Sequence, residues 1–469
     1  MEVLGEKCGV FGVYGADLDA ARLAFFGLYA LQHRGQESSG IAVSDGRKLT
    51  RHVGMGLVSQ VYTEADIEKL QGHIAIGHNR YSTMGGSVLE HGQPAFAHPS
   101  TRLGASSALA LAHNGNLPST KLLEEFLARR GVEAAGLSDS RMIAEAIACH
   151  LADSLAIEDA IARTFPLMTG AFSILILTPT KLIALRDAYG IRPLCFARFD
   201  GGYVFASESC AFHPIGATYE RDVRPGEMLV IDSTGVHSRA LAKGREQLDI
   251  FEFVYFARPD SELLGQSVYE TRRRAGEELA REAKVAADIV VPVPETAIPV
   301  AIGYAATTGI PLEMALVKNR YIHRTFIAPE QHIREQGVKL KLTPLPEIIR
   351  DKRIAVIDDS VVRGTTSKQI VAMLFEAGAK AVHFLLASPP VKFPDFYGID
   401  TPNQKKLLAA SHSREEMRSY LGATTLHFLS LAGLIKAIGV SRDRLCTSCF
   451  TGDYPIDLLE RTKEVNYSV

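Results

Sequence analysis

Two adjacent acids, followed by a glycine and three hydroxyl side chains, form the clearest chemical motif of this sequence. The run Arg353-Ile-Ala-Val-Ile-Asp-Asp-Ser-Val-Val-Arg-Gly-Thr-Thr-Ser367 places Asp358 and Asp359 after an apolar segment and Gly364 before a helix-like one. A glycine loop at a helix N-terminus directs unpaired N–H groups and the positive dipole end toward an anion. The motif therefore predicts a phosphate site, with carboxylates suited to sugar hydroxyls or magnesium. Its expected ligand residues are Asp358, Asp359, Ser360, Arg363, Gly364, Thr365, Thr366 and Ser367.

Five short polar motifs in the first half form a second chemical group. They centre on Cys8, Arg34, Arg80, the pair Asn114-Gly115, and Asp139. A cysteine thiolate can attack an amide carbonyl, and side-chain or backbone amides can stabilise the resulting oxyanion. An arginine fork can bind a carboxylate, and an aspartate can pair with an ammonium group. Taken singly, each motif is better explained by a turn or a buried structural residue.

The elements around the phosphate motif indicate a parallel sheet covered by helices. Apolar runs without polar alternation occupy 288–293, 312–317, 353–357 and 381–387. Such runs are typical of strands buried on both faces. The helix after the phosphate loop is expected to end at Gly378.

The first half predicts a different architecture, of the α+β class with stacked sheets. Strand-like runs occupy 8–14, 171–185 and 203–206, and helical spacing occupies 20–31. The polar segment 240–248 is expected to connect the halves. We therefore predict a domain at 8–245 and a second domain, with a C-terminal extension, at 246–469.

The phosphate motif resembles the signature of the type I phosphoribosyltransferases. This resemblance implies that Asp358 and Asp359 bind the ribose diol and that the loop holds the 5-phosphate. It places a pyrophosphate loop at Val293-Pro-Glu-Thr-Ala-Ile-Pro299, with Thr296 beside a magnesium ion held by both acids. The long polar stretch from Lys318 to Lys341 is expected to form an active-site lid, with Lys318 and Arg324 facing the pyrophosphate.

Together and in this order, the motifs of the first half match the glutaminase domain of the amidotransferases with an N-terminal nucleophile. The whole chain resembles the amidophosphoribosyltransferase family. The resemblance implies that Cys8 is the nucleophile and that Asn114 and Gly115 form the oxyanion hole. It also implies that Arg80 and Asp139 bind glutamine, with Arg34 as a further pocket residue. Residues 1–7 would be a propeptide, because the base in this class is the free α-amino group of the cysteine, with a pKa of about 8.

The expected reaction transfers ammonia from glutamine to C1 of phosphoribosyl pyrophosphate, which opens purine synthesis. Magnesium is the expected cofactor, purine nucleotides are the expected inhibitors, and the enzyme is expected to be a homo-oligomer. Two alternatives stay open. One is an amidotransferase that shares only the glutaminase half, and the other is an inactive sensor of phosphoribosyl ligands.

A pair of cysteines near the C-terminus, Cys446 and Cys449, has the spacing of metal ligands. Iron–sulfur members of the family use four cysteines, and Asp249 and Asp395 stand at the other two places. Because such clusters favour thiolates, a [4Fe-4S] centre is doubtful. A Cys2Asp2 zinc site and a site without metal both remain chemically possible.

Composition excludes several classes of protein. The 469 residues include 51 basic and 53 acidic side chains, a net charge of −2, which disfavours nucleic acid as a partner. No uncharged stretch is long enough to span a membrane, and the first residues are not a secretory signal. Six cysteines in a chain of this length indicate a reducing compartment, so we expect a cytoplasmic enzyme.

Overall fold

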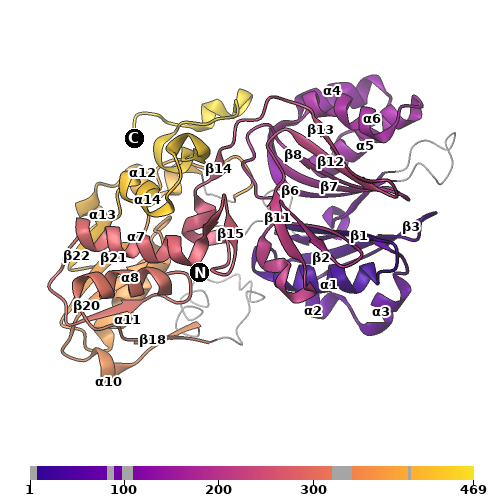
Figure 1. The fold of residues 1–469 in the computed structure, drawn as a ribbon. Coiled ribbons are helices and arrows are strands. Elements are labelled where there is room, and N and C mark those ends of the chain that lie inside the picture. Colours follow the sequence, from indigo (N-terminus) through magenta and orange to yellow (C-terminus); the bar gives the residue numbers. More distant parts are fainter. Residues whose placement is uncertain (1–7, 82–88, 98–108, 320–340, 400–402) are drawn as a thin grey trace.

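The computed structural model describes residues 8–81, 89–97, 109–319, 341–399 and 403–469. The chain forms two halves that lie side by side, one built on antiparallel sheets and one on a parallel sheet (Figure 1). No helix among the described residues is long and apolar enough to cross a membrane. The expected propeptide 1–7 and most of the expected lid, 320–340, lie outside the described residues.

The first half contains two sheets stacked face to face. The first sheet has the order β11 (Thr218–Asp222), β9 (Cys195–Phe199), β10 (Gly202–Ala206), β1 (Gly9–Gly15), β4 (Ile74–Arg80), β2 (Ser38–Ser44), β3 (Leu49–Met55). The second has the order β13 (Gly235–Ala240), β12 (Glu227–Asp232), β8 (Leu182–Arg186), β7 (Thr169–Leu177), β6 (Leu109–Ser119), β5 (Ala95–Ala97). The strands expected within 8–14, 171–185 and 203–206 all belong to these sheets.

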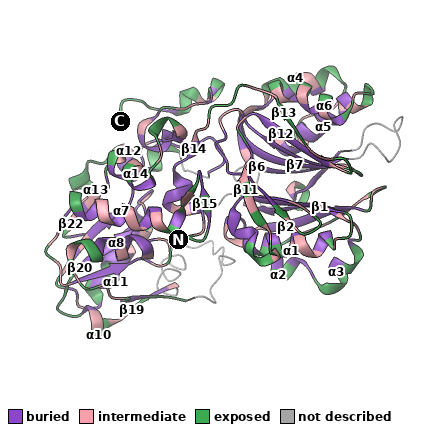
Figure 2. Cartoon of the chain, in the orientation of Figure 1, coloured by how far each residue is buried: buried purple, intermediate pink, exposed green. Residues whose placement is uncertain are grey.

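Helices cover the outer face of each sheet and complete four layers (Figures 1 and 2). The first sheet is covered by α1 (Ala20–Ala30), α2 (Val58–Val61) and α3 (Glu64–Lys69). The second is covered by α4 (Lys121–Arg129), α5 (Asp139–Ala152) and α6 (Ile157–Thr164). Between the sheets, Val10 and Ile76 pack with Leu175 and Leu229 in one apolar core. Strands buried on both faces in this way carry apolar residues without alternation, which is why β1 reads Gly-Val-Phe-Gly-Val-Tyr-Gly.

The second half is built on a parallel sheet, as expected. Its order is β17 (Ile289–Pro292), β20 (Arg353–Asp358), β21 (Ala381–Leu386), β22 (Thr425–Phe428). One face packs on α7 (Val268–Glu282), α8 (Ile298–Thr308) and α14 (Leu431–Ile438). The other face packs on α11 (Thr365–Glu376) and α13 (Arg414–Leu421).

One predicted strand of this sheet is wrong. Leu312 makes only an isolated bridge to Val290, and the chain then forms β18 (Leu316–Lys318). That strand pairs antiparallel with β19 (Leu342–Pro344), outside the parallel sheet. Val317 and Lys318 are exposed, so an apolar run alone did not indicate burial here.

Short elements complete the second half and join it to the first. These are β14 (Leu248–Asp249) with β23 (Leu445–Cys446), β15 (Glu262–Leu263) with β16 (Gln266–Ser267), and the helices α10 (Pro346–Ile349), α12 (Leu408–Ser411) and α15 (Ser448–Thr451). Between β13 and β14 the chain has no regular structure, as expected for the connection near 240–248. A π-helix, Glu252–Phe256, follows β14 and lies at the junction of the halves.

Candidate active sites

Cys8 lies at the wall of a cavity of about 590 Å³, which is lined by the first half and by Glu460, Arg461 and Glu464 of the C-terminal segment. The residue comes directly before β1, and its Sγ donates to the carbonyl of Tyr81 at 3.7 Å. Burial raises the pKa of this thiol to about 11. A thiol in this state needs a base before it can act as a nucleophile at neutral pH.

The two residues expected to bind the glutamine backbone line the same cavity. Arg80 is the last residue of β4, and Asp139 is the first residue of α5. Asp139 accepts from the backbone N of Ser140 at 2.6 Å, so its carboxylate is held at the positive end of the helix. The cavity thus presents a cation and an anion to a bound zwitterion.

The two expected oxyanion residues lie on β6 and face differently. Gly115 lines the cavity, and an added Cβ atom there would lie 2.0 Å from the carbonyl oxygen of Ala171. Only glycine fits at that position. Asn114 is buried beside it, and its Nδ2 donates to the Oγ of Ser207 at 3.4 Å. The same Oγ accepts from the backbone N of Val10 at 2.9 Å, so Ser207 ties Asn114 to the start of β1.

A buried network that the sequence analysis missed supports this cavity. The Oε1 of Gln93 accepts from the backbone N of His113 at 2.7 Å, and its Nε2 donates to the Oγ of Ser140 at 3.1 Å. The Nδ1 of His113 lies 3.7 Å from the carboxylate of Asp139, and burial lowers the pKa of this imidazole. His113 adjoins Asn114 in the sequence, but its partners come from two other segments, Gln93 from one and Asp139 with Ser140 from the other.

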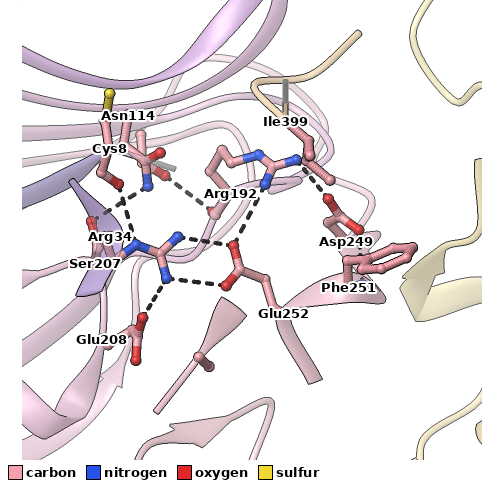
Figure 3. Close-up of polar contacts among 12 residues, drawn as sticks. Cys8, Arg34, Asn114, Arg192, Ser207, Glu208, Asp249, Phe251, Glu252 and Ile399 are labelled. Carbon is pink, nitrogen blue, oxygen red and sulfur yellow. Dashed lines mark hydrogen bonds and ion pairs between the residues drawn. The ribbon is translucent and has the colours of Figure 1, made fainter. Parts of the chain in front are cut away.

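Arg34 does not occupy the position expected of a pocket residue. It is 2% exposed, and the lining of the described cavity does not include it. Its Nε donates to the carbonyl of Cys8 at 3.2 Å, and its other nitrogens bond to Glu208 and Glu252 (Figure 3). Glu252 belongs to the second half, so Arg34 holds the nucleophile and joins the two halves. This position differs from the one expected of a glutamine contact.

In the second half, the structure brings together the acids and the residue expected beside magnesium. Asp358 ends β20, Asp359 follows it, and the Oγ1 of Thr296 donates to the Oδ2 of Asp359 at 2.6 Å. Burial raises the pKa of the Asp358 and Asp359 carboxyls. The charge of the neighbouring Asp359 raises the pKa of Asp358 further. A divalent cation would relieve both effects, so these residues fit Mg²⁺.

The loop after the acids has the expected geometry for an anion. Gly364 has φ = 79° and precedes α11, whose N-terminus has no side-chain cap among the described residues. No side chain therefore caps the N–H groups of the first turn, which an anion site at a helix N-terminus requires. Ser360, Arg363, Thr365, Thr366 and Ser367 belong to this loop and first turn.

The expected pyrophosphate contacts are only partly described. The Nζ of Lys318 lies 3.7 Å from Glu295, a residue of the predicted pyrophosphate loop. Arg324 lies outside the described residues.

The residues at the possible second metal site do not fit a metal. The Nη2 of Arg192 donates to Asp249 at 2.7 Å (Figure 3). The same atom lies 4.0 Å from Asp395, so a guanidinium stands beside both carboxylates. Burial raises the pKa of the Cys446 and Cys449 thiols, and Asp249 raises both further. Among the described residues, no three His, Cys, Asp or Glu side chains are grouped to hold a metal. A guanidinium fixed beside two of the four side chains disfavours a cluster or zinc there.

Comparison with known proteins accounts for both halves. A sequence family described as "Glutamine amidotransferase domain" matches residues 89–214. The amidophosphoribosyltransferase of Bacillus subtilis is 44% identical over 464 residues, which cover 98% of this chain and 96% of that protein. The amidophosphoribosyltransferase of Synechococcus elongatus is 46% identical, covering 98% of this chain and 93% of that protein.

A solved structure agrees with these relatives. The glutamine phosphoribosylpyrophosphate amidotransferase of B. subtilis, complexed with ADP and GMP, superposes with a TM-score of 0.89 at 44% identity, covering 96% of this chain and 98% of that one. Because the matches span both halves, neither a glutaminase-only relative nor an inactive sensor is favoured. The chain belongs to the amidophosphoribosyltransferase family, which catalyses the first committed step of purine biosynthesis by transferring ammonia from glutamine to phosphoribosyl pyrophosphate.

Proposed function

We propose that the reaction is divided between two centres, a glutaminase site at 8–245 and an acceptor site at 246–469. The observation that carries the proposal is that Cys8, Arg80, Gly115 and Asp139 line one cavity. In the first centre the Cys8 thiolate attacks the side-chain amide of glutamine, ammonia leaves, and water hydrolyses the thioester to glutamate. In the second centre ammonia attacks C1 of phosphoribosyl pyrophosphate and pyrophosphate leaves.

The base in the first centre is the α-amino group of Cys8. While Lys7 is attached, this nitrogen is a planar amide whose lone pair is delocalised, so it cannot take a proton. Removal of residues 1–7 would convert it into an amine with a pKa of about 8, next to its own thiol. We therefore infer that the active enzyme begins at Cys8.

The other cavity residues bind the substrate and its oxyanion. The guanidinium of Arg80 binds the glutamine α-carboxylate, and the carboxylate of Asp139 binds the α-ammonium. The backbone N–H of Gly115 and the amide of Asn114 donate to the oxyanion, each contributing roughly 3 kcal/mol to the transition state. Arg34 acts on Cys8 through its backbone carbonyl rather than on glutamine.

In the acceptor centre, Asp358 and Asp359 bind the ribose diol. The loop from Ser360 to Ser367 holds the 5-phosphate, with Arg363 and the hydroxyls of Thr365, Thr366 and Ser367 as donors. Lys318 and Arg324 bind the pyrophosphate. Mg²⁺ held near Asp358, Asp359 and Thr296 would neutralise charge on the pyrophosphate as it leaves.

Ammonia passes between the centres inside the protein, because released ammonia would be protonated and lost. Purine nucleotides are proposed as inhibitors, since the B. subtilis relative was solved with ADP and GMP. We also propose a homo-oligomer in the cytoplasm. Metal analysis should find neither four iron and four sulfide per chain nor stoichiometric zinc, because Arg192 stands beside Asp249 and Asp395.

N-terminal sequencing of fully active protein tests the proposal. The first residue should be Cys8, and a working glutaminase that begins at Met1 or Glu2 would contradict the mechanism. The variant Cys8→Ser should lose glutamine-dependent synthesis and retain ammonia-dependent synthesis. Wild-type protein assayed with free ammonia is the control for the acceptor centre.

A further inference from the structure

A turn of the second half, residues 395–399, lies directly against the strand that carries the oxyanion residue. The Nδ2 of Asn116 donates to the carbonyl of Phe396 at 2.8 Å. A Cβ atom at Gly398 would lie 3.1 Å from the carbonyl carbon of Gly115 and 3.2 Å from its Cα. The backbones of Gly115 and Gly398 are therefore in contact across the junction of the halves.

The oxyanion strand leaves its regular ladder close to this point. The pairing of β6 with β7 is regular up to Asn116 and then shifts in register before Ser119. Beyond Asn116, one residue after Gly115, the ladder on that side is irregular. The turn 395–399 supplies the contacts that the ladder does not.

The turn itself is held by its first residue. The Oδ1 of Asp395 accepts from the backbone N of Tyr397 at 2.8 Å and of Ile399 at 2.9 Å. The hydroxyl of the fully buried Tyr397 donates to the carbonyl of Ile456 at 2.8 Å, and that of Tyr454 donates to the carbonyl of Pro394 at 2.7 Å. These bonds leave the turn little freedom relative to the second half.

A buried ionic cluster connects this turn to the nucleophile as well. Asp395 faces Arg192, and the Nη1 of Arg192 lies 3.5 Å from Glu252. Glu252 binds Arg34, whose Nε holds the carbonyl of Cys8 (Figure 3). Residues of the second half thus contact both the segment of the oxyanion residue Gly115 and, through Arg34, the backbone of the nucleophile Cys8.

The turn is also connected to β20, the strand that carries Asp358, through the neighbouring strand β21. The backbone N of Ala387, at the end of β21, donates to the carbonyl of Asp358 at 3.0 Å. From Ala387 the chain runs directly to the turn. If Asp358 moved, the movement would therefore be transmitted to Gly115 through the hydrogen bond to Ala387 and the chain that follows it.

We propose that residues 395–399 are a positioning element of the glutaminase site, in which Phe396 and Gly398 hold the backbone of Gly115 where its N–H meets the oxyanion. This inference rests on the proposed role of Gly115. An oxyanion donor works only within about 2.7–3.1 Å of the developing charge, so displacement by a few tenths of an ångström weakens catalysis. The element acts on the transition state, since a ground-state amide does not require the same donor distance.

The variant Gly398→Ala tests the contact. The new methyl group would press on Gly115, so kcat for glutamine hydrolysis should fall about tenfold or more, while KM for glutamine changes less than about threefold. Ammonia-dependent synthesis should remain near the wild-type rate. The matched control is Gly378→Ala, because Gly378 also has positive φ, at 96°, but contacts the side chain of Arg350 away from the junction.

A second pair of variants separates positioning from folding. Asp395→Ala removes the acceptor for the N–H groups of Tyr397 and Ile399, whereas Asp395→Asn keeps an oxygen at that place. Glutaminase kcat should fall in Asp395→Ala and be largely restored in Asp395→Asn. If Gly398→Ala does not fold, as judged by lost ammonia-dependent synthesis, this pair decides the question.

The outcomes distinguish this inference from the proposed function. Alkylation by a diazoketone analogue of glutamine reports whether Cys8 is the nucleophile in wild-type protein. If Cys8 is not labelled, the proposed function fails. If Cys8 is labelled and Gly398→Ala hydrolyses glutamine at the wild-type rate, or Asp395→Ala does so, the positioning role is wrong while the proposed function stands.

Discussion

At the residue scale, the two acids of the acceptor centre are confined to the second half. Asp358 and Asp359 do not line the glutamine cavity, whose described lining comes from the first half and the C-terminal segment. The double variant Asp358→Asn, Asp359→Asn should therefore abolish synthesis of phosphoribosylamine from both glutamine and ammonia. Basal glutamine hydrolysis should survive. Ammonia-dependent synthesis near the wild-type rate would show that these acids do not bind the acceptor.

The same acids predict a pH dependence. Burial raises the pKa of both carboxyls, so the folded protein without ligand keeps protons that the unfolded chain releases near pH 4. Their contribution to folding stability is therefore largest at low pH and falls as pH rises toward the raised pKa. Mg²⁺ binds the ionised form, so stabilisation by Mg²⁺ with phosphoribosyl pyrophosphate should grow over the same range.

Thermal unfolding at about pH 5.5 and about pH 8, with and without these ligands, measures this effect. The increase in Tm on adding ligand should be larger at the higher pH. The double variant of Asp358 and Asp359 serves as the control, because it has no carboxyl at either position to titrate. An equal increase in Tm at both pH values would contradict the assignment.

At the element scale, the phosphate loop depends on a single glycine. Gly364 has φ = 79°, and a Cβ atom there would lie 2.7 Å from Leu408. The variant Gly364→Ala should lower the free energy of unfolding by more than the roughly 1–2 kcal/mol of a left-handed residue alone. It should also raise KM for phosphoribosyl pyrophosphate, because the N-terminus of α11 would move.

Gly309→Ala is the matched control for the loop. Gly309 ends α8 with φ = 74°, and no atom lies within 4 Å of an added Cβ there. The Gly309→Ala variant should lose only the unfolding free energy that a left-handed residue costs, and its KM for phosphoribosyl pyrophosphate should be unchanged. Equal effects of the two variants in urea unfolding and in KM would show that the loop does not hold the phosphate.

At the scale of the whole molecule, a buried ion pair joins the halves. Arg34 and Glu252 bond at 3.0 and 3.1 Å, and both side chains are almost fully buried. Glu252→Gln leaves a buried guanidinium with one partner fewer, so unfolding should require about 3–5 kcal/mol less free energy. It should also release more glutamate per phosphoribosylamine formed, because a weaker junction between the halves would let ammonia escape.

The control for this variant is Glu270→Gln on the surface of α7. Glu270 pairs with Arg273, and both side chains are more than a third exposed, so the change should cost less than about 1 kcal/mol. Urea unfolding compares the two variants. A Glu252→Gln protein as stable as the control would show that the junction does not depend on this ion pair.

Local sequence was enough to predict most of the elements and to suggest the chemistry that each can carry. Strand β20, the acids at its end and the glycine loop before α11 are consecutive, so spacing alone indicated an anion site. The motifs around Cys8, Arg80, Gly115 and Asp139 likewise indicated candidate residues. Three of these residues lie at the start or end of a regular element, and Gly115 lies within β6. The prediction that 312–317 forms a strand of the parallel sheet was wrong, because an apolar run does not indicate which sheet a strand joins.

Tertiary structure alone decided which residues meet. Arg34 was expected in the glutamine pocket, but burial of its charge required acidic partners, and these came from Glu208 and from Glu252 in the other half. Asp395 and Asp249 were considered as metal ligands, and the fold instead placed Arg192 beside them. The contact of Gly398 with Gly115 joins residues 283 positions apart, and no local pattern encodes such a separation. A buried charge needs a partner, and that partner can come from any part of the chain that the fold places beside it. The same holds for a close contact between two glycines, so only the complete fold determined these pairings.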